Sequence, residues 1–275
     1  MRPLARAEMA NRACLVVAWG LVTKPLRVPL EDLRPGVRLL TGPVARYIGR
    51  VHRLRPGDGL LLFDPVMGVE AGARVGAGDA RGVYCEVGEV HQSGYRAHPI
   101  TLLQGLAKAE KPDAVIRDAT ALGVASIVFI ETERTVARVS AERSAARHER
   151  WKRIAVEAAR QSGRGNLPSV RGPLPITGAL TSAREDQRIV LLPGAPPLLE
   201  QLRQWQPEQS IALLIGPEGG LSSSEARLAE DARFSPASLG STTLRTELAG
   251  VAALGALVAL LQFPWRDGRS RAWVG

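Results

Sequence analysis

From residue 100 onward, short apolar runs alternate with helical patterns, and this alternation restricts the fold more than any other feature of the sequence. Ile100–Gly105, Ile127–Ile130 and Ile211–Ile215 are short and apolar. In Asp113–Leu122 and Glu149–Ser162, apolar residues recur at three- and four-residue spacing, as on one face of a helix. Strands that alternate with helices predict an α/β domain with a largely parallel sheet. In such sheets, ligands bind at the carboxyl ends of the strands.

The residues before this region predict a smaller, strand-rich module. Val37–Leu40 and Leu60–Phe63 are short apolar runs, while Val69–Val75 and Val83–Val90 alternate apolar and polar residues. This pattern is typical of half-buried antiparallel strands, and we expect a small β-barrel. His91–Pro99 contains Gly94 and Pro99 and is expected to be a linker.

A short helix is expected over Ala45–Leu54. It would expose Arg46, Arg50 and Arg53 along one side. The chain as a whole carries a formal net charge of +9, which favours an acidic partner such as nucleic acid. A basic but merely solvated surface, produced by a GC-biased genome, is the alternative.

Basic residues concentrate in two segments, one in each predicted domain. Lys24–Arg55 contains eight basic and two acidic residues, and Arg134–Arg171 contains ten basic and three acidic residues. Two such segments fit a clamp on a phosphate backbone.

The cysteines and histidines show no metal-binding or disulfide spacing, so we expect no metal site. The apolar run Cys14–Val22 is a weak match to a secretory signal, because it is short and lacks a small-residue cleavage site. Leu248–Phe263 is shorter than a membrane span and predicts a buried helix. These features predict a soluble, cytoplasmic protein without a membrane segment.

Three glycine-containing turns follow predicted strands and are the candidate ligand loops. The clearest is Gly216–Gly220, with the sequence Gly-Pro-Glu-Gly-Gly. Its glycine spacing does not match a dinucleotide-binding turn, and Leu221 stands where a phosphate-binding loop needs Lys. A ligand recognised by other groups than its phosphates is therefore expected. Leu192–Gly194 and Leu239–Gly240 are the other two turns.

Helix starts follow two of these turns. Ser222–Glu225 has the spacing of a capping box, which predicts a helix that begins there. Arg245 and Glu247 precede the longest apolar helix, and taken alone they could be a structural ion pair.

Together, these motifs resemble the ribosomal RNA uridine N3-methyltransferases of the SPOUT superfamily. The resemblance rests on Ile215–Gly220 and on Leu239-Gly followed by Leu-Arg-Thr-Glu247. It extends to Lys108–Lys111, the Glu133–Arg134 pair and the block from Trp151 to Arg164. Roughly residues 45–265 are covered, in the order of the family.

The resemblance implies a fold that periodicity does not show. It implies a trefoil-knotted SPOUT domain over residues 99–265, preceded by a PUA-like β-barrel over residues 21–92, with an extension over 1–20 and a tail over 266–275. The family also implies a homodimer.

The resemblance further implies an S-adenosylmethionine-dependent methyltransferase that acts on N3 of a uridine in small-subunit (16S) ribosomal RNA. The three turns would form the cofactor pocket, through Leu192, Pro193, Gly194, Gly216, Pro217, Glu218, Gly219, Gly220, Leu239, Gly240 and Leu244.

Uracil N3 methylation requires loss of the imide proton, and a fixed cation would stabilise the resulting charge on the carbonyl oxygens. Arg245 is the first candidate for this role. Either Glu247 or Glu218 could accept the proton or position Arg245.

The candidates for binding RNA, as ribosomal RNA or the 30S particle, are Arg50, Arg53, Arg160 and Arg164. Two alternatives remain open. The same fold could methylate a ribose or another base, or the chain could be a catalytically silent RNA-binding or ribosome-assembly protein.

Overall fold

The structure is a computed structural model that describes residues 25–136, 144–203, 205–206 and 208–262. The expected extension, the apolar run Cys14–Val22 and the expected tail lie outside the described residues.

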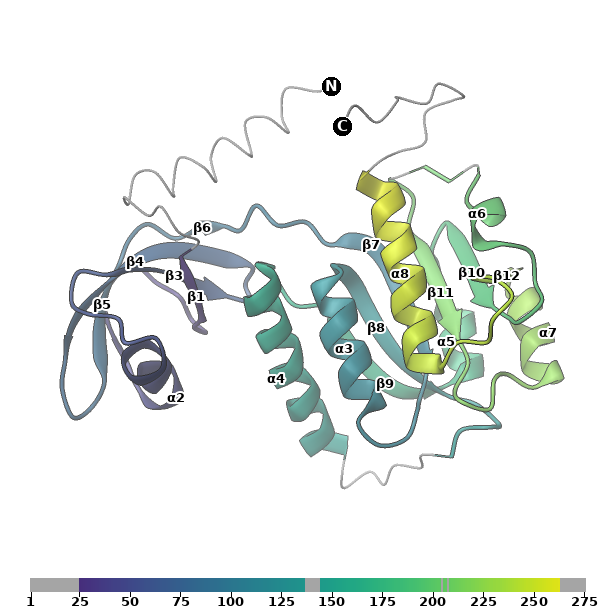
Figure 1. The fold of residues 1–275 in the computed structure, drawn as a ribbon, viewed down its shortest axis with the longest axis horizontal. Helices are drawn as coiled ribbons and strands as arrows, with labels where there is room; N and C mark the ends of the chain where they lie inside the picture. Colours follow the sequence, from purple (N-terminus) through teal and green to yellow (C-terminus); the bar gives the residue numbers. More distant parts are fainter. Residues whose placement is uncertain (1–24, 137–143, 204, 207, 263–275) are drawn as a thin grey trace. The chain divides into compact units, whose positions relative to one another are not determined.

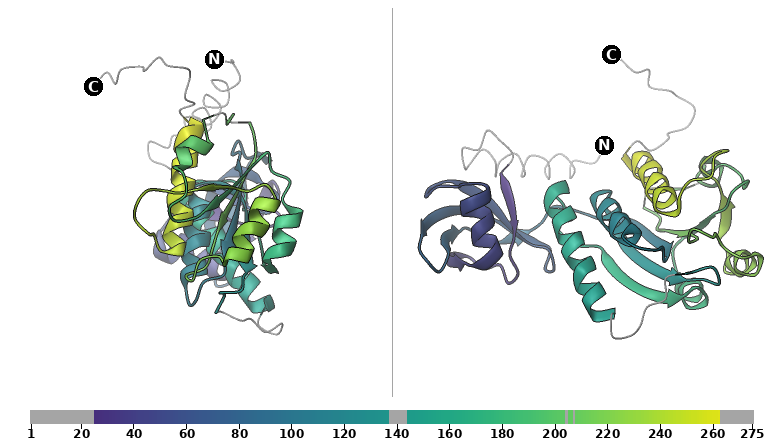
Figure 2. Two further views of the ribbon diagram at one scale, coloured as in Figure 1. Left: turned by 90° about the vertical axis from the view of Figure 1, so that its right-hand side faces the viewer. Right: turned by 60° about the horizontal axis from the view of Figure 1, so that its bottom comes forward.

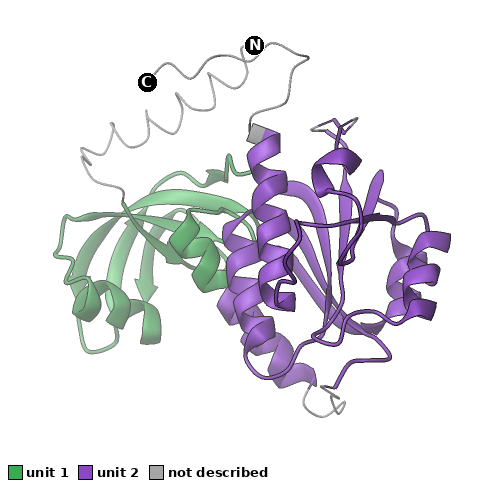
Figure 3. Ribbon diagram, turned by 45° about the vertical axis from the view of Figure 1, so that its right-hand side comes forward, with its two compact units in different colours: residues 1–96, 155–167 green, residues 97–154, 168–275 purple. Residues whose placement is uncertain are grey.

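The chain divides into two compact units, which Figure 3 colours separately. Unit 1 comprises residues 1–96 and 155–167, and unit 2 comprises residues 97–154 and 168–275.

Unit 2 is built on a six-stranded sheet with the strand order β12-β10-β11-β7-β8-β9, in which every pairing is parallel. This confirms the predicted α/β domain with a parallel sheet. The strands are β7 (His98–Gly105), β8 (Val124–Glu131), β9 (Ser169–Pro175), β10 (Gln187–Leu191), β11 (Ile211–Ile215) and β12 (Ser235–Ala237). The helices are α3 (Lys111–Ala121), α4 (Ser144–Ser162, whose second half belongs to unit 1), α5 (Ile176–Ser182), α6 (Leu198–Gln201), α7 (Ser223–Asp231) and α8 (Thr246–Gln262).

Helices cover both faces of this sheet, which explains why β11 in its middle is apolar throughout. On one face, Leu103 of β7 and Leu214 of β11 pack in a core that includes Ile176 of α5. On the other face, α8 contacts α3, β7 and β11, and α3 and α8 lie side by side in Figures 1 and 2. All five residues of β11 are buried, and its bounds are those that the sequence predicts.

Unit 1 contains a second six-stranded sheet with the order β1-β3-β4-β5-β2, in which β6 pairs with β4. Its core includes Val28, Ile48 and Leu62. The elements are β1 (Leu26–Pro29), β2 (Gly36–Leu40), α2 (Gly42–Arg46), η1 (Tyr47–Val51), β3 (Gly59–Asp64), β4 (Val69–Gly78), β5 (Val83–Val87) and β6 (His91–Gln92).

Two local predictions in this region need correction. The expected linker His91–Pro99 is not free of strands, since β6 occupies its start and β7 begins at His98. The expected helix Ala45–Leu54 begins earlier, as α2, and ends at Val51 in one π-helical turn, η1. Arg53 therefore lies beyond the helix, with a left-handed backbone (φ +53°).

The segment 155–167 belongs to unit 1, although the sequence places it within the second domain. The Leu167 backbone N–H donates to the Pro65 carbonyl oxygen at 3.1 Å. Arg27 Nη2 donates to the Arg164 carbonyl oxygen at 3.3 Å. The predicted domain 99–265 is therefore interrupted, because bonds to distant residues hold this segment in the other unit.

Candidate active site at the strand ends of unit 2

A pocket of about 970 Å³ opens where loops leave the carboxyl ends of β10, β11 and β12. The three glycine-containing turns that the sequence singles out all reach it. It is lined by Leu192, Pro193, Gly194, Gly216, Pro217, Glu218, Gly219, Gly220, Leu239, Gly240, Leu244 and Arg245, which are all eleven expected cofactor residues and one expected catalytic residue. Glu247, the other expected catalytic residue, is not among the lining residues.

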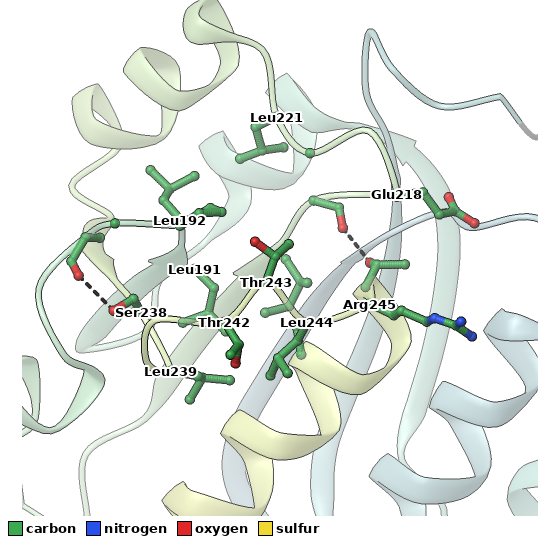
Figure 4. A pocket seen from close by; sticks show the side chains of 18 of the residues that line it. Leu191, Leu192, Glu218, Leu221, Ser238, Leu239, Thr242, Thr243, Leu244 and Arg245 are labelled. Carbon is green, nitrogen blue, oxygen red and sulfur yellow. Dashed lines mark hydrogen bonds between the residues drawn. The ribbon is translucent and has the colours of Figure 1, made fainter.

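The pocket has an apolar end and a charged end. Figure 4 shows the side chains of Leu192, Leu239 and Leu244 around one part of the space. Glu218 and Arg245 lie together at the other side. Such a pocket suits a ligand with an apolar part at one end and charged groups at the other.

The turn Gly216–Gly220 takes its shape from glycine and from close packing. Gly220 has a φ of +70°, which side-chain-bearing residues rarely adopt, and its N–H donates to the Pro217 carbonyl oxygen at 2.9 Å. The end of β7 lies directly against the turn, because a Cβ atom added to Gly105 would be 2.2 Å from the Pro217 nitrogen.

Glu218 fastens this turn to the loop after β7. Its Oε1 accepts the Lys108 backbone N–H at 3.1 Å and Lys111 Nζ at 2.9 Å. Burial alone would raise the pKa of Glu218, but the bonds from Lys111 and from backbone N–H groups outweigh it and hold the pKa below its ordinary value. The single carboxylate of the glycine-rich turn is thus a bridge between two loops.

Lys111 also approaches Glu247, whose Oε2 lies 3.5 Å from Nζ. One lysine therefore balances two carboxylates, one from the turn after β11 and one from the start of α8, and the hydrogen bond with Glu218 is the largest cause of its raised pKa. Arg245, in contrast, is exposed, and among the described residues no hydrogen bond or ion pair engages its guanidinium. Arg245 and Glu247 thus do not form the structural ion pair that the sequence left open.

The loop after β8 forms the outer wall of the pocket. Arg134 Nη1 donates to the Gly219 carbonyl oxygen at 2.8 Å. The Glu133 backbone N–H donates to Oε1 of Glu225 at 2.7 Å, and Oε2 of the same buried carboxylate accepts the Ser222 N–H. The predicted capping box of Ser222 and Glu225 is confirmed, and it also ties this loop to the turn.

Ser238 joins the two remaining loops. Its Oγ donates to the Ala195 carbonyl oxygen at 2.7 Å, and its backbone N–H donates to the Pro196 carbonyl oxygen at 2.7 Å. The loops after β10 and β12 are therefore held as one wall.

The four arginines expected to bind RNA lie in unit 1, in different environments. Arg50 and Arg53 are exposed. Arg160 is half-buried, is paired with Glu157 and lies over the Tyr47 ring at 4.5 Å. Arg164 is 1 % exposed, and its Nε donates to the Asn166 carbonyl oxygen at 2.6 Å. The expectation for Arg164 is wrong, because a buried guanidinium bonded to the chain cannot reach a phosphate.

Several pocket residues are not predicted from the sequence, among them Lys111, Arg134 and Thr246. Lys111 and Arg134 stand in segments that carry the family resemblance, but only the folded chain shows which loop they reach. Within the described residues, no cluster of three metal-binding side chains occurs. In the same part of the chain, no helix has both the length and the apolarity of a membrane span.

The fold and the pocket define an α/β protein that binds a small ligand at the carboxyl edge of a parallel sheet. Residues 95–258 match the model of a family described as RNA methyltransferase domain. The chain belongs to this RNA methyltransferase family.

Relatives support this assignment over most of the chain. The ribosomal RNA small subunit methyltransferase E of a Synechocystis strain is 33 % identical over 257 residues, which cover 92 % of this chain and 81 % of the relative. The protein of that name from Neisseria gonorrhoeae, solved bound to S-adenosyl methionine, has a TM-score of 0.75 and 28 % identity over 86 % of this chain and 98 % of that one. A Legionella pneumophila protein solved with the bound cofactor SAM has a TM-score of 0.77 and 30 % identity, with 86 % and 98 % covered.

Proposed function

We propose that this protein transfers a methyl group from S-adenosylmethionine to N3 of a uridine in small-subunit ribosomal RNA. The observation that carries the proposal is the pocket in which three glycine-containing turns meet beside Arg245. The guanidinium of Arg245 makes no hydrogen bond or ion pair with the described residues. The relatives that bear the name small subunit methyltransferase E support the RNA substrate class. Ribosomal RNA as the substrate also supports a cytoplasmic location.

The residues of the pocket fit S-adenosylmethionine. Leu192, Leu239 and Leu244 offer apolar surface to an adenine ring, and the turns offer backbone groups to its polar edge. The volume of about 970 Å³ is at the upper end of the range for small-ligand sites, which leaves room for a uracil ring beside the cofactor. When bound, this cofactor supplies a methyl group already activated by its sulfonium.

We assign to residues of this chain the stabilisation of negative charge on the uracil, the positioning of the turn and the acceptance of the imide proton. Arg245 is placed to stabilise the negative charge that develops on the uracil carbonyl oxygens. Glu218 is already bonded twice through one oxygen, so we assign it to positioning the turn. Among the described residues, Glu247 Oε2 is engaged only by the longer, 3.5 Å ion pair with Lys111, so we assign to Glu247 the acceptance of the imide proton.

We further propose that unit 2 carries the trefoil knot of the SPOUT superfamily and that unit 1 is PUA-like. The knot is supported by the path of the chain at its end. The strand β12 lies at the edge of the sheet, yet α8 packs on β7 and β11 in its middle, beside the turn after β11.

We also propose that the protein is a homodimer through α8. Leu248 is 51 % exposed on this helix, and Val251, Ala252 and Ala256 are only partly buried. A second copy would cover this apolar surface. We expect a dimer by light scattering at micromolar concentration, and a purely monomeric protein would contradict this proposal.

Methyl transfer to small ribosomal subunits tests the function. The purified protein, labelled S-adenosylmethionine and subunits from a strain that lacks the gene are combined, and the digested RNA is analysed by mass spectrometry. We expect N3-methyluridine. A methylated ribose or another methylated base would point to the other enzymatic function, and no transfer together with intact RNA binding would indicate the silent protein.

A further inference from the structure

A buried polar chain lies directly behind the pocket. Gln104 of β7 is 1 % exposed, and its Nε2 donates to Thr246 Oγ1 at 2.7 Å. Thr246 is 5 % exposed, and its Oγ1 donates to the Gly216 carbonyl oxygen at 2.5 Å. Three segments that are far apart in the sequence are thus joined at one point.

Chemistry fixes the direction of both bonds. The Gly216 carbonyl oxygen can only accept, so the Thr246 hydroxyl must give it its single hydrogen. The hydroxyl can then only accept from Gln104, which forces the NH₂ side of that amide toward Thr246. The other end of the amide, Oε1, faces α8 and has no hydrogen-bond partner among the described residues.

Gly250 of α8 makes room for this amide. A Cβ atom added there would lie 2.8 Å from Gln104 Oε1 and 3.6 Å from a Leu102 methyl group. A buried acceptor without a partner costs free energy, and glycine in a helix is unfavourable relative to alanine. Apolar residues at these positions would avoid both costs, so an apolar core alone does not explain the arrangement.

The position of Thr246 indicates the role for which the unpaired Gln104 oxygen and the helical Gly250 are retained. It stands between Arg245 and Glu247, and its hydroxyl bonds to the first residue of the turn Gly216–Gly220. Any shift of this bond moves the turn relative to both of those side chains. Gln104 holds the hydroxyl from behind and does not itself line the pocket.

We propose that Gln104 is a positioning residue for methyl transfer, which through Thr246 sets the register between the cofactor turn and the pair Arg245 and Glu247. The inference rests on the proposed function of the pocket. Because Gln104 reaches the Gly216 carbonyl group only through the Thr246 hydroxyl, the two side chains work as one unit.

The test compares Gln104→Met and Thr246→Val with Thr246→Ser in the full-length protein. We expect the first two to lower the single-turnover rate, at saturating cofactor and small subunits, by about tenfold to a hundredfold, the scale of a small misplacement of reacting groups. Thr246→Ser keeps the hydroxyl and is expected to remain close to the parental rate. The double variant is expected to be no slower than the slower single variant.

Two controls separate positioning from general stability. Ile176→Val removes buried volume in α5, away from the hydrogen bonds of Gln104 and Thr246, and is expected to lower Tm without lowering the rate. Gly250→Ala pushes on the Gln104 amide and is expected to lower the rate, whereas Gly178→Ala in α5 meets nothing within 4 Å and is expected to leave the rate unchanged.

Hydrogen exchange of the amides in Gly216–Gly220 gives a readout that needs no methyl transfer. We expect faster exchange in Gln104→Met than in Ile176→Val. Parental rates and parental exchange in Gln104→Met, or losses that multiply in the double variant, would overturn the inference. If the parental protein itself methylated nothing, the proposed function would be wrong instead. Unchanged hydrogen exchange in Gln104→Met would still show that Gln104 does not position the turn.

Discussion

Two cations at the pocket differ in what they are bound to. Lys111 is shared by two carboxylates, whereas the guanidinium of Arg245 is engaged by none of the described residues. A cation that is already paired with carboxylates is largely neutralised, whereas an unpaired cation can stabilise negative charge that develops on a substrate. The chemistry of the site is therefore expected to depend on Arg245.

We expect Arg245→Ala to lower turnover by about a hundredfold or more, the usual loss for one preorganised donor. Cofactor and RNA affinity are expected to stay near parental values, because this residue acts on charge that appears during the reaction. Rapid-quench methylation and calorimetry measure the two quantities. Arg227→Ala, an exposed arginine of α7 outside the pocket, is the matched control. A parental rate in Arg245→Ala would reject its catalytic role.

Gly219 and Gly220 of the turn are constrained to glycine by different physical effects. A Cβ atom on Gly219 would lie 3.0 Å from the Cβ atom of Arg134, so a side chain there displaces the outer wall. Gly220 needs its left-handed backbone, and a non-glycine residue there costs about 1–2 kcal/mol.

We expect Gly220→Ala to weaken cofactor binding by about tenfold. This corresponds to roughly 1.4 kcal/mol of left-handed backbone strain in the cofactor-bound conformation of the turn. Isothermal calorimetry measures the change. Gly178→Ala in α5 meets no atom within 4 Å and serves as the control. Equal affinity of the parental protein and Gly220→Ala would show that the turn does not hold the cofactor.

At the scale of elements, the pocket is a set of loops that bond to one another. Glu218 links the turn after β11 to the start of α3, Arg134 links it to the loop after β8, and Thr246 links it to α8. Each strand end is fixed by its neighbours, which preorganises the site before a ligand arrives.

The Lys111–Glu218 pair gives this network a pH dependence. The pKa of Glu218 is lowered in the folded protein, so the stabilisation is present above its ordinary value, about 4.3, and is lost as the pH falls through the lower, folded value. We expect Lys111→Met to reduce the free energy of unfolding by about 0.5–1 kcal/mol at pH 7, as for a partly exposed pair.

Urea denaturation of both proteins between pH 7 and pH 3 measures this difference, which is expected to shrink toward the acid end. Arg117→Met, which removes a pair with Asp118 on the surface of α3, controls for charge loss alone. A difference that stays constant with pH would exclude Glu218 as the partner whose ionisation matters.

The sequence predicts elements well where one local pattern decides them. Ile211–Ile215 is apolar on both faces and ends at a glycine, so its bounds are predicted to the residue. Lys111 and Glu218 are 107 residues apart, and no local pattern joins them. The RNA-binding prediction for Arg164 is wrong for a similar reason. Its basic surroundings suggest a surface residue, but the Tyr95 ring beside its guanidinium comes from a distant part of the chain.

At the scale of the whole molecule, a net charge of +9 is distributed over both units, and its arginines are not equivalent. The side chains of Arg50 and Arg53 are exposed and make no hydrogen bond or ion pair with the described residues. Arg160 and Arg164 are held by intramolecular contacts. Contacts to phosphate are therefore expected from the first pair.

We expect the double variant Arg50→Ala, Arg53→Ala to weaken RNA binding and to flatten its salt dependence by about 1.5 in the slope of log K against log salt. The single-turnover rate at saturation is expected to be retained, because neither residue is in the pocket. Filter binding across a salt series is the measurement. Arg81→Ala, whose charge Asp79 already balances, is the control, and an unchanged slope in the double variant would place the RNA elsewhere.

The membership of residues 155–167 in unit 1 has a consequence for how the protein is made. The strands of unit 1 leave the ribosome first, but the residues that bond to Pro65 and Arg27 come only after the stretch from Ala97 to Ile154. At roughly 5–20 residues per second, that stretch takes on the order of several seconds to synthesise. During this interval the nascent strands lack the hydrogen bonds that Leu167 and Arg164 supply, so unit 1 cannot complete its native contacts until part of unit 2 has been synthesised.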